Sequence, residues 1–109
     1  MIRHISMFHM DPSPANGCTV EENMASLRAF LEDFQALDPR IVGCRVGVSV
    51  DTPQEIPAGA SVLLTQVILM LDFARSEDAA AFPASEAHQE LMAFSKGMVS
   101  QVAAIDFEI

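Results

Sequence analysis

The stretch from Val62 to Phe73, VLLTQVILMLDF, decides the fold because its apolar residues fall on both faces of an extended chain. One face would carry Val62, Leu64, Ile68 and Met70, and the other Leu63, Val67, Leu69 and Leu71. A strand that is apolar on both faces is typical of one that is buried on both sides. We therefore predict a strand over residues 62–73 with a cover on each face.

Three further strands are predicted before and after this one in the sequence. Residues 42–50 alternate strictly, with Val42, Cys44, Val46, Val48 and Val50 on one face. Residues 2–10 read as a first strand in which His4 and Phe8 share a face and His9 lies on the other, at the surface or on the helix side. Residues 101–109 alternate again and predict a closing strand.

Two helices are predicted between the strands. Thr19 and Glu22 have the spacing of a capping box, and apolar residues at helical spacing extend the first helix over 20–37. Its predicted inward residues are Leu27, Phe30, Leu31 and Phe34. For the second helix we expect Ser76 as the cap and a break at Pro83. Its two segments would be 77–82 and 86–98, with Leu91, Phe94 and Met98 inward.

The order β-α-β-β-α-β is that of a ferredoxin-like α+β domain, a four-stranded antiparallel sheet with helices on one face. We expect residues 1–109 to form one such domain. Because strand 62–73 is apolar on both faces, we predict a homodimer joined through its sheet faces, which gives a dimeric α/β barrel. The alternatives are a monomer with a merely apolar sheet, or a cover supplied by another partner.

Composition excludes several partners. A formal net charge of −9, from six Lys and Arg against fifteen Asp and Glu, argues against nucleic acid and anionic membranes. No apolar run is long enough to span a bilayer, and the opening residues lack a signal-peptide pattern, so a cytoplasmic location is expected. We expect Cys18 and Cys44 to be unpaired thiols, and no metal or cofactor motif is present in the sequence.

Short motifs along the whole chain resemble the stress-responsive α/β-barrel (Dabb) family. Ile2-Arg3-His4-Ile5 followed by Phe8 is similar to the opening of that family. The other matching motifs are Pro39-Arg40-Ile41 with Val46-Gly47, Phe73 with Glu77-Asp78 and Phe82, Ala87-His88-Gln89, and Asp106-Phe107-Glu108. The resemblance implies a dimeric ferredoxin-like barrel.

The family joins polyketide cyclases, stress proteins that form large oligomers and many members without known activity, so fold alone does not fix function. The resemblance places His88 at the histidine of a plant cyclase of this type, and Phe82 where that cyclase has a tyrosine. Ser85 to His88 replace the family's frequent His-Pro-x-His, so the first histidine and the proline are gone. A phenylalanine neither donates nor accepts a proton, which counts against that cyclase mechanism.

The candidate site is a pocket oriented by two histidines, His4 and His88. The residues predicted to line it are His4, Phe8, Met70, Phe82 and His88. His88 is the candidate for proton transfer, because a neutral imidazole moves protons near pH 7. Each residue also has a purely structural interpretation. His88 would be a helix residue that hydrogen-bonds to a backbone carbonyl, and His4 a buried histidine whose nitrogens are hydrogen-bonded within the core. Phe82 and Met70 would be core residues with no ligand contact.

Three functions remain open. The first is binding of a small apolar or aromatic molecule in the barrel; the second is a cofactor-independent cyclase, isomerase or decarboxylase for a polyketide-like substrate. The third is a structural stress protein that acts as an oligomer. Arg45 either holds an anionic ligand or pairs with an acid, and the fifteen acids favour pairing.

Overall fold

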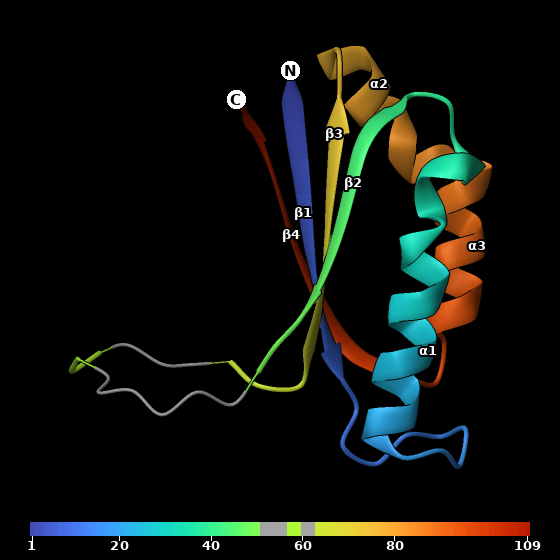
Figure 1. Ribbon diagram of the computed structural model, residues 1–109, viewed down its shortest axis with the longest axis vertical. Helices are drawn as coiled ribbons and strands as arrows, with labels where there is room; N and C mark the ends of the chain where they lie inside the picture. The colour runs from blue at the N-terminus through green and yellow to red at the C-terminus, as the bar shows by residue number, and fades with distance from the viewer. Residues whose placement is uncertain (51–56, 60–62) are drawn as a thin grey trace.

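Four antiparallel strands form one layer of the molecule in the computed structural model, which describes residues 1–50, 57–59 and 63–109 (Figure 1). The strands are β1 (Ile2–Met10), β2 (Ile41–Val48), β3 (Gln66–Phe73) and β4 (Val99–Glu108). Their order in the sheet is β2-β3-β1-β4, so β1 and β3 are central and β2 and β4 are edges. This is the ferredoxin-like arrangement that the order of elements predicts.

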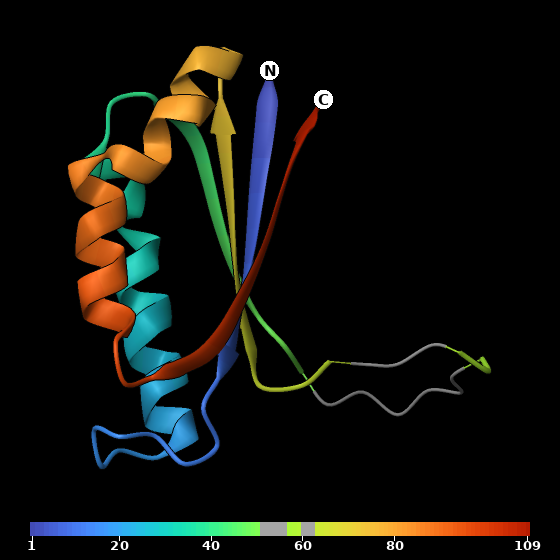
Figure 2. The same ribbon diagram turned by 180° about the vertical axis from the view of Figure 1, so that it is seen from behind.

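The helices form the second layer, all against one face of the sheet, as Figures 1 and 2 show from opposite sides. They are α1 (Val20–Glu32), η1 (Phe34–Leu37), α2 (Ser76–Ala81), η2 (Phe82–Ala84) and α3 (Glu86–Ser95). None of the helices in the described ranges is long and apolar enough to cross a membrane. The sheet therefore has a helix-covered face and an open face.

Local sequence explains where most helices begin. The capping box at α1 is confirmed: the Glu22 amide donates to Thr19 Oγ1 at 3.1 Å, and the Thr19 amide donates to Glu22 Oε1 at 2.9 Å. The N-cap of α2 is Arg75 rather than Ser76, which is the first helical residue. Ser85 caps α3 by accepting the His88 amide, so the break after Pro83 is confirmed.

The predicted ends of both helices need correction. The first helix is not continuous over 20–37: α1 ends at Glu32, and a 3₁₀ turn follows at 34–37. The tighter turn places Phe34 in the core with no exposed surface. Similarly, α3 ends at Ser95 rather than 98, because Gly97 takes a positive φ of 82° that turns the chain toward β4.

Two strands also differ from their predicted extent. The predicted start of the third strand at Val62 lies outside the described residues, and β3 begins only at Gln66. Thr65, at φ 57°, interrupts the extended chain just before it. In β2 the register shifts between Ile41 and Gly43, so Val42 drops out of the predicted alternation and is exposed.

The core lies between the helices and the covered face of the sheet. Its buried members from the helices include Leu27, Leu31, Phe34, Phe82 and Leu91; those from the sheet include Phe8, Val67, Leu69, Leu71 and Phe73. Phe30 is only half-buried, and its ring stacks on Phe94 at 4.4 Å between centroids. Phe94 is 36% exposed, so its predicted inward position is wrong: it packs between helices near the surface.

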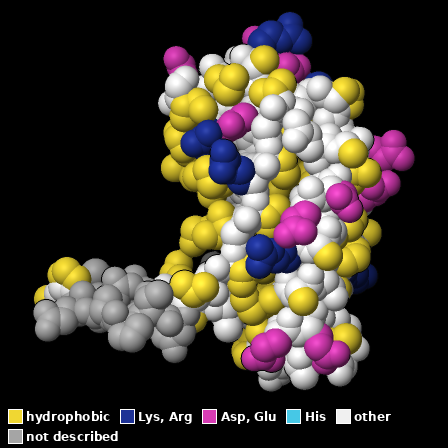
Figure 3. All heavy atoms as spheres, viewed as in Figure 1, with side chains coloured by type: hydrophobic (Ala, Val, Ile, Leu, Met, Phe, Trp, Pro, Cys, Tyr) yellow, Lys and Arg dark blue, Asp and Glu magenta, His cyan; other side chains and the backbone are white. Residues whose placement is uncertain are grey.

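The open face of the sheet is apolar at its centre. The strand registers place Ile5, Met7, Ile68, Met70, Ile105 and Phe107 on this face. Ile105 is 59% exposed, and the helices lie on the other side of the sheet. Figure 3 shows hydrophobic side chains along this flank, with charged groups among them. An uncovered apolar surface of this kind marks an interaction site.

Candidate functional site

Three aromatic rings meet on the covered face of the sheet: those of His4, Phe82 and His88. The centroid of the Phe82 ring lies 5.8 Å from that of His4 and 5.3 Å from that of His88. The Phe82–His88 contact is edge-to-face, a favoured arrangement for rings. Two imidazoles therefore flank one phenyl ring, although their residues are 84 positions apart in the sequence.

The cluster is held by a central strand, a 3₁₀ turn and a helix. His4 lies on the central strand β1, with its side chain on the helix side of the sheet. Phe82 begins η2, where Pro83 ends α2, and its ring also contacts Phe34 and Phe73. Because Ser85 caps α3, His88 falls in the first turn of that helix, six residues after Phe82.

The His4 ring is fixed at both nitrogens. Its Nδ1 lies 2.5 Å from Asp106 Oδ1, and its Nε2 lies 2.7 Å from Ser6 Oγ. A carboxylate only accepts, so Nδ1 donates to Asp106, while Nε2 shares a hydrogen bond with the Ser6 hydroxyl. Asp106 comes from β4, which the register of β1 and β4 places directly opposite His4. The chain Asp106–His4–Ser6 thus sets the tautomer and orientation of one imidazole.

His88 is the chemically freer of the two histidines. Burial lowers the pKa of His88 below its ordinary value, and the nearby His4 lowers it further. Its ring has no side-chain hydrogen bond to the described part of the chain. A neutral imidazole with an unengaged nitrogen can accept or donate a proton, or hydrogen-bond a ligand.

The remaining two predicted lining residues lie elsewhere. Phe8 shares the covered face with His4 but is buried in the core, with Ser6 between them on the strand. Met70 lies opposite Ile5 and projects from the open face of β3, so it is not part of a pocket with His4 and His88. The sequence could not assign Met70 to a face, because both faces of β3 are apolar.

Ser6 and Asp106 are site residues that the sequence reasoning missed. Ser6 could have been found from the alternation of β1, since it shares the face of His4. Asp106 is beyond such reasoning, because its contact depends on the register between two strands about a hundred residues apart.

A groove on the side of β4 shares Asp106 with the cluster, but His4, Phe82 and His88 do not line it. This groove of about 330 Å³ lies between α2 and β4, with Ala79 and Ala80 on one wall and Asp106 and Phe107 on the other. Asp106 is a wall of this groove and also the partner of His4, and its side chain is 56% exposed. A small molecule in the groove would therefore meet the carboxylate that holds the His4 ring.

The lowered pKa of His88 predicts a pH dependence of stability. The folded protein favours the neutral ring, so between pH 6.5 and the lower folded pKa only the unfolded chain takes up the proton. The free energy of unfolding should fall as the pH drops through this window. Urea unfolding at pH 7.5 and 5.5 should show a smaller loss for His88→Gln than for the wild type; equal losses would contradict the assignment.

Within residues 1–50, 57–59 and 63–109, no three His, Cys, Asp or Glu side chains converge so as to hold a metal ion. The groups that the site itself presents are two imidazoles, a carboxylate and a hydroxyl.

Comparison with known proteins gives matches among solved structures alone. No family model and no curated protein matches the chain. A dimeric ferredoxin-like protein of unknown function from Bacteroides fragilis is 19% identical, with a TM-score of 0.70 over 99% of this chain and 95% of that one. A dimeric ferredoxin-like protein of unknown function from Thermobifida fusca is 18% identical, with a TM-score of 0.69 over 99% and 90%. An antibiotic biosynthesis monooxygenase is 10% identical, with a TM-score of 0.65 over 100% and 98%. At these identities the likeness is one of fold, and it confirms the ferredoxin-like class.

Proposed function

We propose that the protein is a homodimer of the Dabb type that binds a small, flat, apolar or aromatic molecule beside His4, Phe82 and His88. The observation that carries the proposal is the meeting of two imidazoles around one buried phenyl ring. The apolar ring supplies contact area, and imidazole nitrogens supply orientation. A weakly acidic hydroxyl, such as that of a phenol, suits a neutral imidazole acceptor.

The sheet faces support the dimer. In the part of the chain that the structure describes, the open face carries six large apolar side chains, and the helices all lie against the other face. A second copy would cover the face with an identical surface, as a two-fold axis requires. Two of the solved structures with this fold are described as dimeric.

The Dabb resemblance gains support from the same cluster. His4 and His88 are the histidines that the resemblance assigns to the ligand pocket, and both turn toward Phe82. Phe82 occupies the place of the cyclase tyrosine and fills the space between them with an apolar ring. This favours binding over acid chemistry at that position.

Removal of the His88 imidazole should weaken ligand binding while the dimer stays intact. With 2-naphthol as a fluorescent, weakly acidic probe, His88→Ala should raise the dissociation constant about 10-fold, the usual loss for one hydrogen bond. Met92→Ala is the matched control, because Met92 is an exposed residue of the same helix. Equal affinity of His88→Ala and the wild type for the probe would overturn the proposed site.

A second candidate function is a cofactor-independent cyclase, isomerase or decarboxylase. The Asp106–His4–Ser6 chain favours it, because a hydrogen-bonded carboxylate and hydroxyl hold one imidazole in a defined tautomer. His88, with its lowered pKa, would then act as the base near neutral pH. Turnover that is lost in both His88→Ala and Asp106→Asn would favour the enzyme over the binding protein.

A further inference from the structure

The contacts of the His4 ring have the connectivity of a serine nucleophile with its base and its orienting acid. Asp106 Oδ1 lies 2.5 Å from His4 Nδ1, and Ser6 Oγ lies 2.7 Å from His4 Nε2. In serine hydrolases a carboxylate likewise binds Nδ1, and the nucleophilic hydroxyl binds Nε2. We propose that Ser6 is a nucleophile that accepts an acyl group from a small carboxylic ester, with His4 as its base and Asp106 as the positioning residue. This acyl transfer goes beyond the binding function proposed above and shares His4 with it.

The first argument is that the backbone itself sets these contacts. His4 and Ser6 are alternate residues of β1, so their side chains leave the same face of the strand. Asp106 lies directly opposite His4 in the register of β1 with β4. Because β1 is paired with a neighbouring strand on each side, the nucleophile and its base both stand on a central strand. Sites on strands hold their geometry more precisely than sites on loops.

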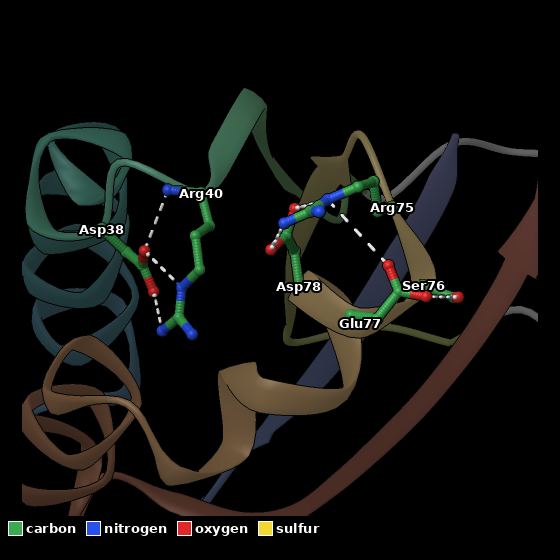
Figure 4. A network of polar contacts seen from close by, with 6 residues as sticks. All are labelled: Asp38, Arg40, Arg75, Ser76, Glu77 and Asp78. Atoms are coloured by element: carbon green, nitrogen blue, oxygen red, sulfur yellow. Dashed lines mark hydrogen bonds and ion pairs between the residues drawn. The ribbon is translucent and has the colours of Figure 1, made fainter.

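The second argument concerns the charge of Asp106. Arginines bind three other aspartates of the described chain, which are Asp38, Asp72 and Asp78. Figure 4 shows two of these pairs, Asp38 with Arg40 and Asp78 with Arg75. The ion-pair partner that the described residues give Asp106 is His4. Because no arginine of these ranges pairs with Asp106, its charge can stabilise the imidazolium that forms when His4 takes a proton.

The third argument is that Ser6 has one accessible side. Ser6 is 6% exposed, so a substrate must reach it past a neighbouring residue. Opposite Ser6 on β3 lies Leu69, which is fully buried, whereas opposite it on the edge strand β4 lies Ala104, which is exposed. The approach from β4 thus passes a single methyl group, which favours a small acyl group. The proposed dimer joins the open faces of the sheets, and Ala104 lies on the other face of β4.

The fourth argument is the second imidazole. The tetrahedral intermediate of acyl transfer carries a negative oxygen, which needs a hydrogen-bond donor. The rings of His4 and His88 flank Phe82, and His88 makes no side-chain hydrogen bond to the described residues. Burial lowers the pKa of His88, which keeps its ring neutral with one N–H to donate. His88 is thus the donor that this scheme assigns to the oxyanion.

The reaction balances with water as its co-reactant. When the His4 ring is neutral, Nε2 accepts the Ser6 proton while Oγ forms a bond to the acyl carbon. The bond from that carbon to the leaving oxygen then breaks, and the leaving alcohol takes the proton from Nε2. Water attacks the acyl-serine by the same route: His4 takes a proton from the water and returns it to Ser6 Oγ as the carboxylic acid leaves. No electron is transferred to or from the ester.

A fluorophosphonate with a short alkyl chain tests the nucleophile, because an activated serine displaces its fluoride and becomes bonded to phosphorus. In the full-length wild type, peptide mass mapping should find the label on Ser6. This result does not depend on the folding of any variant. An unlabelled wild type, or a label spread over exposed serines such as Ser26 and Ser100, would overturn the inference.

Three variants test the assigned roles. Ser6→Ala should abolish the labelling, and Asp106→Asn should slow it about 100-fold or more, because the His4 ring loses its orientation and its charge partner. His88→Ala should slow it about 100-fold through loss of the oxyanion donor. Ser95→Ala is the matched control, since Ser95 is also 6% exposed and its hydroxyl donates to the Met92 carbonyl; it should label at the wild-type rate. Circular dichroism checks that each variant is folded.

The remaining outcomes separate this inference from the proposed function. An unchanged rate in folded Asp106→Asn would show that Asp106 does not position the base, and an unchanged rate in His88→Ala would remove the oxyanion role. Absence of the label in a wild type that binds 2-naphthol would overturn acyl transfer and leave the binding function standing. Labelling of Ser6 in a wild type that does not bind 2-naphthol would support acyl transfer and contradict the binding function.

Discussion

Ile68→Asp should convert the proposed dimer into a monomer. Ile68 lies at the centre of the open face, between Met7 on β1 and Gly47 on β2. In a face-to-face dimer its aspartate would be buried against apolar side chains without a partner, and an unpaired buried charge costs several kcal/mol. A penalty of about 4 kcal/mol would raise the dimer dissociation constant about 1,000-fold.

Light scattering at micromolar concentration measures this result directly. Met92→Asp is the matched control, because it places the same charge on an exposed residue of α3, away from the sheet, and should leave the mass unchanged. A wild-type mass of one subunit at that concentration would contradict the proposed dimer. A dimeric Ile68→Asp would show that the subunits meet elsewhere, and circular dichroism would report whether the variant keeps its helices.

Phe34→Ala should lower the free energy of unfolding by about 3–5 kcal/mol, the usual cost of removing a fully buried aromatic ring. Phe34 has no exposed surface, and its ring lies 6.0 Å from those of Phe30 and Phe82. Its loss leaves a cavity directly behind Phe82. We therefore expect weaker 2-naphthol binding as well as lower stability, measured by urea unfolding and fluorescence.

Phe30→Ala provides the comparison within the same part of the chain. Phe30 is half-buried and stacks on Phe94 near the surface, so its truncation should cost less than that of Phe34. Equal or larger destabilisation by Phe30→Ala would mean that the inward face of α1 is centred on Phe30. The two variants together test where the core ends and the helix surface begins.

The fold class could be predicted from the sequence because local patterns report it. Period-two and period-3.6 alternation located the strands and helices, and the capping box at Thr19 placed the start of α1. The order of these elements then restricts the topology to few arrangements. Errors lay at boundaries, such as Thr65 before β3 and the 3₁₀ turn after Glu32, where single backbone angles outweigh the pattern.

The candidate site could be predicted only in part. A resemblance placed His4 and His88 in one pocket, and the structure brings both to Phe82. Met70 was misplaced because hydrophobicity cannot tell the two faces of β3 apart; the helices decide which face they cover. Composition favoured an acid partner for Arg45, but among the described residues Arg45 forms no ion pair, and Arg3 holds both oxygens of the nearby Asp72.

The sequence by itself determined the helices and strands and their order. It also determined that the sheet has a second apolar face, which two helices packed on one side leave uncovered. These features depend on residues that are close together in the chain. The tertiary structure alone decided which side chains meet. His4 reaches Asp106 through the register of β1 with β4, and Arg3 reaches Asp72 through the register of β1 with β3. Both depend on contacts between residues distant in sequence, and strand register and side-chain competition carry no local signal.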